Sequence, residues 1–213
     1  MNGKKMEMDL PKRLEHLFSV ISEPQFLEMK GLGNEIPFFI CPFNPADLVE
    51  MERDRKTLVA RLLQAGVQVL EIDLYDLSIE ILKERGIFDR IFTEETSFSK
   101  EQLKELLQGV LDPEFHLVPA IAAKIREKET HGGFSVMFLS GIGEVFPYVR
   151  SHNVVNNLQK VAKDKPTVMF FPGGYTHSRE SGASLDLFER LHDDKYYRAF
   201  NIYHCEPYSR KTR

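Results

Sequence analysis

The residues best suited to chemistry lie in a short polar stretch that follows a buried apolar segment. Arg150, Ser151 and His152 stand where a helix is predicted to begin. Backbone N–H groups at a helix start and a guanidinium can together bind an anion. Tyr175 follows a later apolar segment and Arg198 follows a Tyr-Tyr pair, so both could approach the same place. These five residues form our candidate anion or ligand site.

A purely structural role for the same stretch is the alternative. Ser151 or Asn153 would cap the helix, while Arg150 would pair with a carboxylate such as Asp73 or Asp76. Helix capping uses serine and asparagine routinely, so the residue types favour this structural role. The sequence alone leaves both interpretations open.

Acidic and histidine side chains near the predicted strand ends raise the question of a metal ion. They are Asp73, Asp76, Glu144, His152 and His177. Hard cations need such oxygen ligands. The chain has no HExxH and no other cluster with ligand spacing. We therefore expect no metal and no cofactor.

Motifs for nucleotide hydrolysis and for nucleophilic catalysis are incomplete. Gly141 and Gly143 form a Gly-x-Gly, but Phe146 stands where GxGxxG needs its last glycine. No Walker A sequence occurs. Ser140 precedes Gly141 without a GxSxG elbow. The two glycines therefore indicate turn geometry, and we expect no catalytic residue and no enzymatic activity.

Composition is typical of an ordinary globular protein of about one domain. The chain has 213 residues, of which 42% are hydrophobic and 28% charged. Its net charge of -4 disfavours direct nucleic-acid binding, which needs a basic excess. Cys41 and Cys205 lie far apart, which suits reduced thiols in a cytoplasmic protein. We see no signal peptide and no membrane-spanning apolar stretch, and expect no membrane contact.

Alternation of apolar runs with amphipathic segments predicts the elements that position these residues. Buried strands are predicted at 36–41, 67–73, 134–139, 167–171 and 199–204, with helices between them. A polar loop at 176–184 then leads to a short predicted helix at 185–191.

This alternation predicts an α/β fold in the form of a three-layer α/β/α domain. We expect a mostly parallel sheet of about five strands, Rossmann-like or P-loop-like but without a Walker A. The loops after the strands then meet at one edge, where open α/β sheets bind ligands. We expect one domain over residues 1–213, with a disordered tail at 209–213.

Two helical segments are predicted outside the minimal sheet. Leading helices at 10–31 begin with an amphipathic stripe that either covers the sheet or offers an apolar face to a partner. Residues 87–130 carry no strand pattern and predict a helical insertion, which is a second candidate contact surface. The candidate partner-interface residues of the stripe are Leu14, Leu17, Phe18 and Ile21.

Several stretches together resemble a known family. They are GLGNEIPFFI at 31–40, EIDLY at 71–75, FLSGIGEVFPYVRSHNVVNNL at 138–158, and VMFFPG at 168–173 with YYRAF at 196–200. Their order and spacing resemble the BrxB family of BREX (bacteriophage exclusion) defence systems over roughly residues 10–204. The polar segment 176–184 departs from the family pattern, so a binding role carries over to that loop less directly.

The resemblance implies a cytoplasmic component of a bacterial phage-resistance apparatus. Such systems combine a methyltransferase, a large ATPase and PglZ, an alkaline-phosphatase-like protein. The resemblance implies a non-catalytic adaptor or scaffold that works by protein–protein contact with other BREX proteins, chiefly PglZ. A homodimer is also compatible with the sequence. The alternative function is a ligand-binding or degenerate nucleotide-binding α/β domain with an anion site at the carboxyl edge of its sheet.

Overall fold

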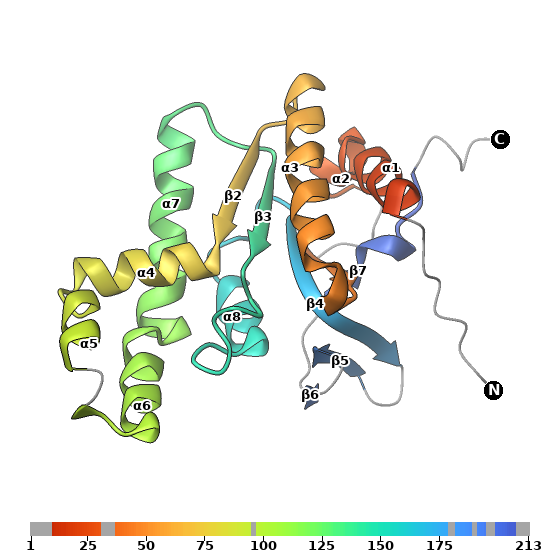
Figure 1. The fold of residues 1–213 in the computed structure, drawn as a ribbon. Coiled ribbons are helices and arrows are strands. Elements are labelled where there is room, and N and C mark those ends of the chain that lie inside the picture. The colour runs from red at the N-terminus through yellow and green to blue at the C-terminus, as the bar shows by residue number, and fades with distance from the viewer. Residues whose placement is uncertain are drawn as a thin grey trace, which may run out of the picture.

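A parallel β-sheet forms the centre of the structure (Figure 1). The computed structural model describes residues 10–30, 37–94, 97–178, 182–188, 191–194 and 199–207. The main path of the sheet has the order β2-β3-β4-β1-β7, and its neighbouring strands are parallel. The strands are β1 (Phe38–Phe43), β2 (Val69–Asp73), β3 (Val136–Ser140), β4 (Thr167–Ser178) and β7 (Phe200–Asn201). This path confirms the predicted α/β class with a mostly parallel sheet.

Strand β1 shows why the fold has three layers. Its apolar run is buried on both faces, because successive side chains of a strand point to opposite sides. Phe38 and Ile40 join one hydrophobic cluster. Phe39 and Cys41 join the cluster on the opposite face, and Cys41 is fully buried, as its apolar surroundings in the sequence predict. Helices must therefore cover the sheet from both sides.

Helices from different parts of the chain cover the two faces (Figure 1). One face carries α1 (Leu10–Ile21), α2 (Pro24–Leu27) and α3 (Leu48–Gln64). The other carries α4 (Leu74–Glu84), α7 (Val118–Thr130) and α8 (Ser151–Leu158). None of the described helices is long and apolar enough to cross a membrane. The predicted α/β/α layering is confirmed.

The start of α3 is fixed close to the carboxyl end of β1. The side chain of Asn44 accepts the backbone N–H of Ala46 at 3.0 Å, and Pro45 opens a short 3₁₀ turn, η1 (Pro45–Asp47). Helix α3 continues directly from this turn. Asparagine caps and proline in the first turn favour a helix start. The local sequence thus places the first turns of α3 beside the carboxyl edge of the sheet.

Residues 87–130 form helices, as predicted, in their described part. They comprise α5 (Phe88–Glu94), α6 (Lys100–Val110), a π-helical turn η3 (Pro113–Leu117) and α7. Ser99 and Gln102 form the capping box that starts α6. Helix α7 runs back beside β2, while α5 and α6 lie farther out (Figure 1). Part of this excursion therefore serves as the crossover that returns the chain to β3.

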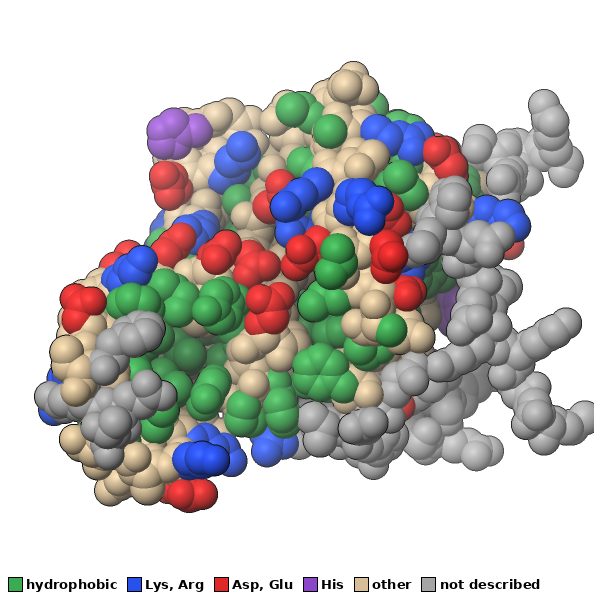
Figure 2. Space-filling model, in the orientation of Figure 1, with side chains coloured by type: hydrophobic (Ala, Val, Ile, Leu, Met, Phe, Trp, Pro, Cys, Tyr) green, Lys and Arg blue, Asp and Glu red, His purple; other side chains and the backbone are tan. Residues whose placement is uncertain are grey.

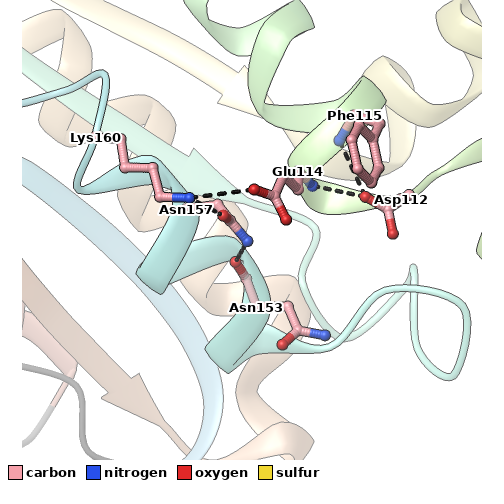
Figure 3. A network of polar contacts seen from close by, with 6 residues as sticks. All are labelled: Asp112, Glu114, Phe115, Asn153, Asn157 and Lys160. Carbon is pink, nitrogen blue, oxygen red and sulfur yellow. Dashed lines mark hydrogen bonds and ion pairs between the residues drawn. The ribbon is translucent and has the colours of Figure 1, made fainter.

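A polar network joins η3 to α8 (Figure 3). Lys160 Nζ lies 3.4 Å from Glu114 Oε1 and donates to Asn157 Oδ1 at 3.1 Å. Asn157 Nδ2 donates to the carbonyl of Asn153 at 2.9 Å. Asp112 caps η3 by accepting two backbone N–H groups of the turn. These contacts attach the outer helical segment to the helix that begins with the predicted anion site.

The carboxyl-terminal hairpin corrects the sequence prediction. Strand β4 continues to Ser178 and pairs in antiparallel fashion with β5 (Gly182–Leu187), which pairs with β6 (Leu191–Asp194). Leu185 and Leu187 are both buried, which is the two-residue period of a strand. The predicted helix at 185–191 is therefore wrong. The segment contains only a few apolar residues, and their spacing is compatible with both a strand and a helix.

The last predicted strand, at 199–204, is shorter than expected. Of this segment, only the two residues of β7 pair with β1, and the chain then turns into the 3₁₀ helix η4 (Ile202–His204). The side chain of Asn201 caps η4 by accepting the backbone N–H of Tyr203 at 3.0 Å. The predicted disordered tail at 209–213 lies outside the described residues.

Candidate functional site

A cavity opens at the carboxyl edge of the sheet, between the first turns of α3 and the loop after β3. Its volume is about 200 Å³. The lining residues are Phe43, Pro45, Leu48, Met51, Glu52, Arg55, Asp73, residues 140–144, Phe170, Pro172 and Phe188. Open α/β sheets bind ligands at this edge. The loops that the sequence brings together therefore surround a real hollow.

Asp73 and Ser140 meet at the ends of two neighbouring strands. They are register partners on β2 and β3, and Ser140 Oγ donates to Asp73 Oδ2 at 2.8 Å. The other oxygen of Asp73 accepts the backbone N–H groups of Tyr75 at 2.9 Å and Asp76 at 3.2 Å. Asp73 is therefore the N-cap of α4.

The Gly-x-Gly after β3 has a steric explanation. Gly141 has a φ of +77°, and a Cβ there would lie 2.6 Å from Asp73 Oδ1. A Cβ on Gly143 would lie 2.9 Å from Pro172 Cγ and 3.0 Å from Phe188 Cζ. Both positions need the absence of a side chain. Turn geometry accounts for Gly141, as predicted, whereas close packing against Pro172 and Phe188 accounts for Gly143.

Phe188 closes one side of the cavity in an uncommon backbone conformation. Its φ is +55°, and its N–H donates to the carbonyl of Pro172 at 2.9 Å. The left-handed region costs a residue with a side chain roughly 1–2 kcal/mol. Such strain persists only where the surroundings impose it and is concentrated at functional sites. The end of β5 therefore holds an aromatic ring at the cavity against an intrinsic preference.

Acidic side chains dominate the charge at the rim. Glu52 from α3 and Glu144 from the loop after β3 line the cavity together with Asp73. Partial burial raises the pKa of Glu144, and the carboxylates of Asp73 and Glu52 raise it further, whereas Arg55 lowers it. The guanidinium of Arg55 also pairs with Glu71, with 2.5 Å between Nη1 and Oε2. The cavity lining thus carries three carboxylates and one guanidinium, which also pairs with Glu71.

A polar groove continues from this rim along α4. Its volume is about 490 Å³, and its lining adds Asp76 and Glu80 to the carboxylates at the cavity. Lys124 pairs with Glu80 there at 2.7 Å. Figure 2 shows acidic side chains in the middle of this face, with Lys and Arg side chains among them and apolar ones beside them. An apolar hollow therefore lies beside a polar groove in which carboxylates outnumber cationic side chains six to three.

The candidate metal ligands do not form a recognisable site in the described part of the chain. No group of three His, Cys, Asp or Glu side chains there could hold an ion. Asp73 is used as a cap, and His152 is buried at the start of α8. The side chain of His177 lies outside the description.

The predicted anion site is brought together only in part. Arg150 is exposed at the N-cap of α8, whereas Ser151 and His152 are buried in its first turn. Tyr175 is buried in β4, and its hydroxyl donates to the carbonyl of Ala199 at 2.5 Å. Burial raises the pKa of Tyr175 to about 12. Arg198 lies outside the described residues. The anion site remains a prediction.

The structural alternative for this stretch also needs correction. Arg150 occupies the N-cap position without a side-chain cap bond, so neither Ser151 nor Asn153 caps α8. Among the residues that the structure describes, Arg150 forms no ion pair with Asp73 or Asp76. The local sequence predicted where the helix begins, but the packing of its first turn decided which side chains point inward.

The leading helix α1 packs on the sheet. Leu17 and Ile21 are buried against α3 and the sheet, while Leu14 and Phe18 pack at the edge of the same cluster. The guanidinium of Arg61 lies 4.2 Å from the centre of the Phe18 ring. Of the two roles predicted for these helices, the structure supports covering the sheet. A partner interface on α1 remains a prediction.

Sequence reasoning missed the cavity walls, although part of the signal was present. Leu48, Met51, Glu52 and Arg55 recur at three- and four-residue spacing in a helix whose start is predictable. They therefore share the helix face that lines the cavity. Phe188 could not be found this way, because its position depends on a hairpin that the sequence pattern did not distinguish from a helix.

Comparison with known proteins identifies the family. The family model described as "BREX protein BrxB" matches residues 70–202. The BREX protein BrxB of Bacillus cereus (strain H3081.97) is 33% identical over 196 residues, covering 90% of this chain and 96% of that protein. The BREX protein BrxB of Escherichia coli O9:H4 (strain HS) is 32% identical over 193 residues, covering 91% of each. No solved structure matches. The chain therefore belongs to the BrxB family of the BREX phage-defence systems.

Proposed function

We propose that this chain is a non-catalytic adaptor of a BREX system that works by protein–protein contact, chiefly with PglZ. Membership of the BrxB family carries the proposal, because a BREX protein acts together with the other proteins of its system. The adaptor role and the choice of PglZ go beyond that membership. They draw support from the chemistry of the sheet edge.

The bonding at the sheet edge favours a role without catalysis. A serine nucleophile needs a base that accepts its proton and a third group that orients the base. Ser140 donates instead to Asp73, whose other oxygen caps α4. A carboxylate that holds a helix start and a strand end together is suited to fixing the shape of a surface. We therefore assign these residues to architecture.

Exposed apolar side chains around the same edge favour protein contact. Leu48, Val49 and Phe188 are large and exposed, and two of them line the cavity. Exposed apolar groups that gather beside a hollow are typical of contact surfaces. The net charge of -4 argues against nucleic acid as the direct ligand.

Co-purification tests the proposal. The tagged chain is co-expressed with PglZ and, separately, with the complete defence locus, and complexes are separated by size-exclusion chromatography at micromolar concentration. We expect PglZ to elute with the chain. A folded chain that captures no BREX protein would contradict the adaptor role. Light scattering on the free chain measures whether it forms a homodimer.

Anion binding at α8 is the second candidate function. The exposed guanidinium of Arg150 at the first turn of the helix favours it, since this end of a helix attracts negative charge. Calorimetric titration with inorganic phosphate and with ATP tests it on the wild type and on Arg150→Ala. Binding that the substitution weakens at unchanged melting temperature supports the site. A lowered melting temperature without any binding supports a structural role.

A further inference from the structure

We propose that the cavity at the sheet edge is the docking site for a basic segment of a partner protein. One large apolar side chain of that segment fills the cavity, and neighbouring lysine or arginine side chains contact Glu52 and Glu144. The inference rests on the proposed function. It adds the surface of this chain that makes the contact and the chemistry that the partner must present.

The cavity is apolar and has the size of one large side chain. Met51 and Phe170 are buried in its lining, whereas Leu48 and Phe188 are 38% and 37% exposed. An apolar cavity of about 150 Å³ accommodates benzene. The volume here is about 200 Å³, which suits a Leu, Met or Phe side chain. Aromatic and aliphatic anchors in such pockets carry much of the affinity of protein interfaces.

Charge complementarity selects a basic segment. Within the described chain, Glu52, Asp76 and Glu144 form no ion pair, while Arg55 pairs with Glu71 and Lys124 with Glu80. Lys56 also lines the groove, but carboxylates outnumber cationic side chains there six to three. A lysine or arginine of the partner would supply the missing positive charge, and a guanidinium can bind a carboxylate through two hydrogen bonds. An acidic segment or a nucleic acid would be repelled by the same carboxylates.

The cavity is shaped before a partner arrives. The backbone of Phe188, with its positive φ and its hydrogen bond to the carbonyl of Pro172, directs the ring toward the cavity lining. Gly143 leaves the space that this ring occupies. Gly141 allows the loop to pass close to Asp73. A preformed pocket loses little conformational entropy on binding, which favours affinity.

Matched variants of the full chain test the site. Leu48→Asp places a charge at the cavity, and Leu63→Asp places one at an exposed position of α3 outside the lining, roughly 22 Å along the helix. The double reversal Glu52→Lys with Glu144→Lys inverts the rim. Glu127→Lys reverses an exposed acid near the end of α7. Each tagged variant is co-expressed with the other proteins of its BREX locus.

We expect L48D and the double reversal each to lower the captured BREX partner roughly tenfold or more. The two control variants should capture an amount of BREX partner within about twofold of that captured by the wild type. Melting temperatures report folding, and the double reversal changes only exposed side chains, so it tests the site even if L48D unfolds. Equal capture by the wild type and by the double reversal overturns the docking site.

Crosslinking identifies the chemistry of the docked segment. A carbodiimide joins carboxylates directly to amines, so it should link Glu52 or Glu144 to a lysine of the captured partner. We expect that lysine to lie within a few residues of a large apolar side chain. Crosslinks confined to other carboxylates, or a partner segment that is acidic, would overturn the inference.

The two proposals fail in different ways. If the wild-type chain captures no BREX protein, the adaptor function fails and the docking site fails with it. If the wild type captures a partner and the double reversal captures it equally, the adaptor function stands and the docking site alone is wrong. High salt should weaken capture by the wild type, because the rim contact is ionic.

Discussion

The leading helix α1 and the cavity at the sheet edge are two apolar regions that differ in solvent exposure. In α1 the apolar stripe is buried, with Leu17 and Ile21 packed against α3 and the sheet. At the edge, Leu48 and Phe188 stay exposed beside a hollow. An amphipathic pattern mainly predicts which residues face the core. A contact surface is better sought where the completed fold leaves apolar side chains uncovered.

Charges in the two regions differ in the same way. Glu15 on α1 receives two hydrogen bonds from Arg61, at 2.7 and 3.1 Å, and this bonding lowers the pKa of Glu15. At the cavity, partial burial and neighbouring carboxylates raise the pKa of Glu144 instead. On α1, the carboxylate of Glu15 is thus paired within the chain. At the cavity, Glu52 and Glu144 form no ion pair among the described residues, which leaves them available to a partner under our proposal.

The largest effect is expected when one apolar side chain is truncated in each region. Leu17→Ala should lower the free energy of unfolding by roughly 2–5 kcal/mol, because it leaves a cavity in the core. Leu48→Ala should change it by about 0.5 kcal/mol at most, because Leu48 is already exposed. Urea unfolding measures both. Similar losses for the two variants would remove the distinction between core and contact surface.

Gly141→Ala tests whether the edge has a fixed shape. The substitution should cost roughly 2 kcal/mol, because φ is +77° and the new Cβ meets Asp73 Oδ1 and the backbone nitrogen of Tyr75. Gly109→Ala in α6 is the control, since nothing lies within 4 Å of its Cβ and alanine favours helices. Thermal unfolding of both variants is the measurement. A G141A protein as stable as the wild type would mean that the loop is free to rearrange.

Asp73→Ala measures the cap at the edge. It should lower the free energy of unfolding by about 1–2 kcal/mol, because α4 loses its N-cap and Ser140 loses its acceptor. Ser140→Ala and the double variant complete the cycle, and the coupling should be about 0.5 kcal/mol or more. Additive effects in chemical unfolding would show that the bond between the two side chains contributes nothing.

Local signals made much of the fold predictable. The apolar run of β1 predicted a buried strand, and the residue types of Asn44 and Pro45 favour a helix start where α3 follows. Each signal is contained in a few adjacent residues, so tertiary structure was not needed to interpret it. The hairpin β5–β6 was missed because Leu185, Leu187 and Leu191 fit two periodicities, and pairing with β4 decides between them.

The sequence predicted where the candidate site lies, but not which contacts its side chains make. The strand ends predicted the edge and the residues near it, including Asp73, Ser140 and Glu144. Whether Asp73 would cap a helix or face a ligand depended on the positions of the N–H groups of α4. The contribution of Phe188 depended on a left-handed backbone that no sequence pattern indicates for phenylalanine.

Glu144→Gln should have the smallest effect on stability, and it is the substitution most specific to the acidic rim. The pKa of Glu144 is raised in the folded chain, so the folded state binds its proton more tightly than the unfolded state. The resulting stabilisation is present at low pH and is lost as pH rises through the raised pKa. In urea unfolding, E144Q should therefore have the same free energy of unfolding as the wild type at about pH 4, and a higher one at about pH 7. The carboxylate of Glu52 contributes to the raised pKa of Glu144. In a chain that already carries Glu52→Gln, the stability gained by Glu144→Gln at the higher pH should therefore be smaller. An E144Q protein that gains no stability on raising the pH would mean that neither burial nor the neighbouring carboxylates raise the pKa of Glu144, and the contrast in charge with the surface of α1 would then not hold.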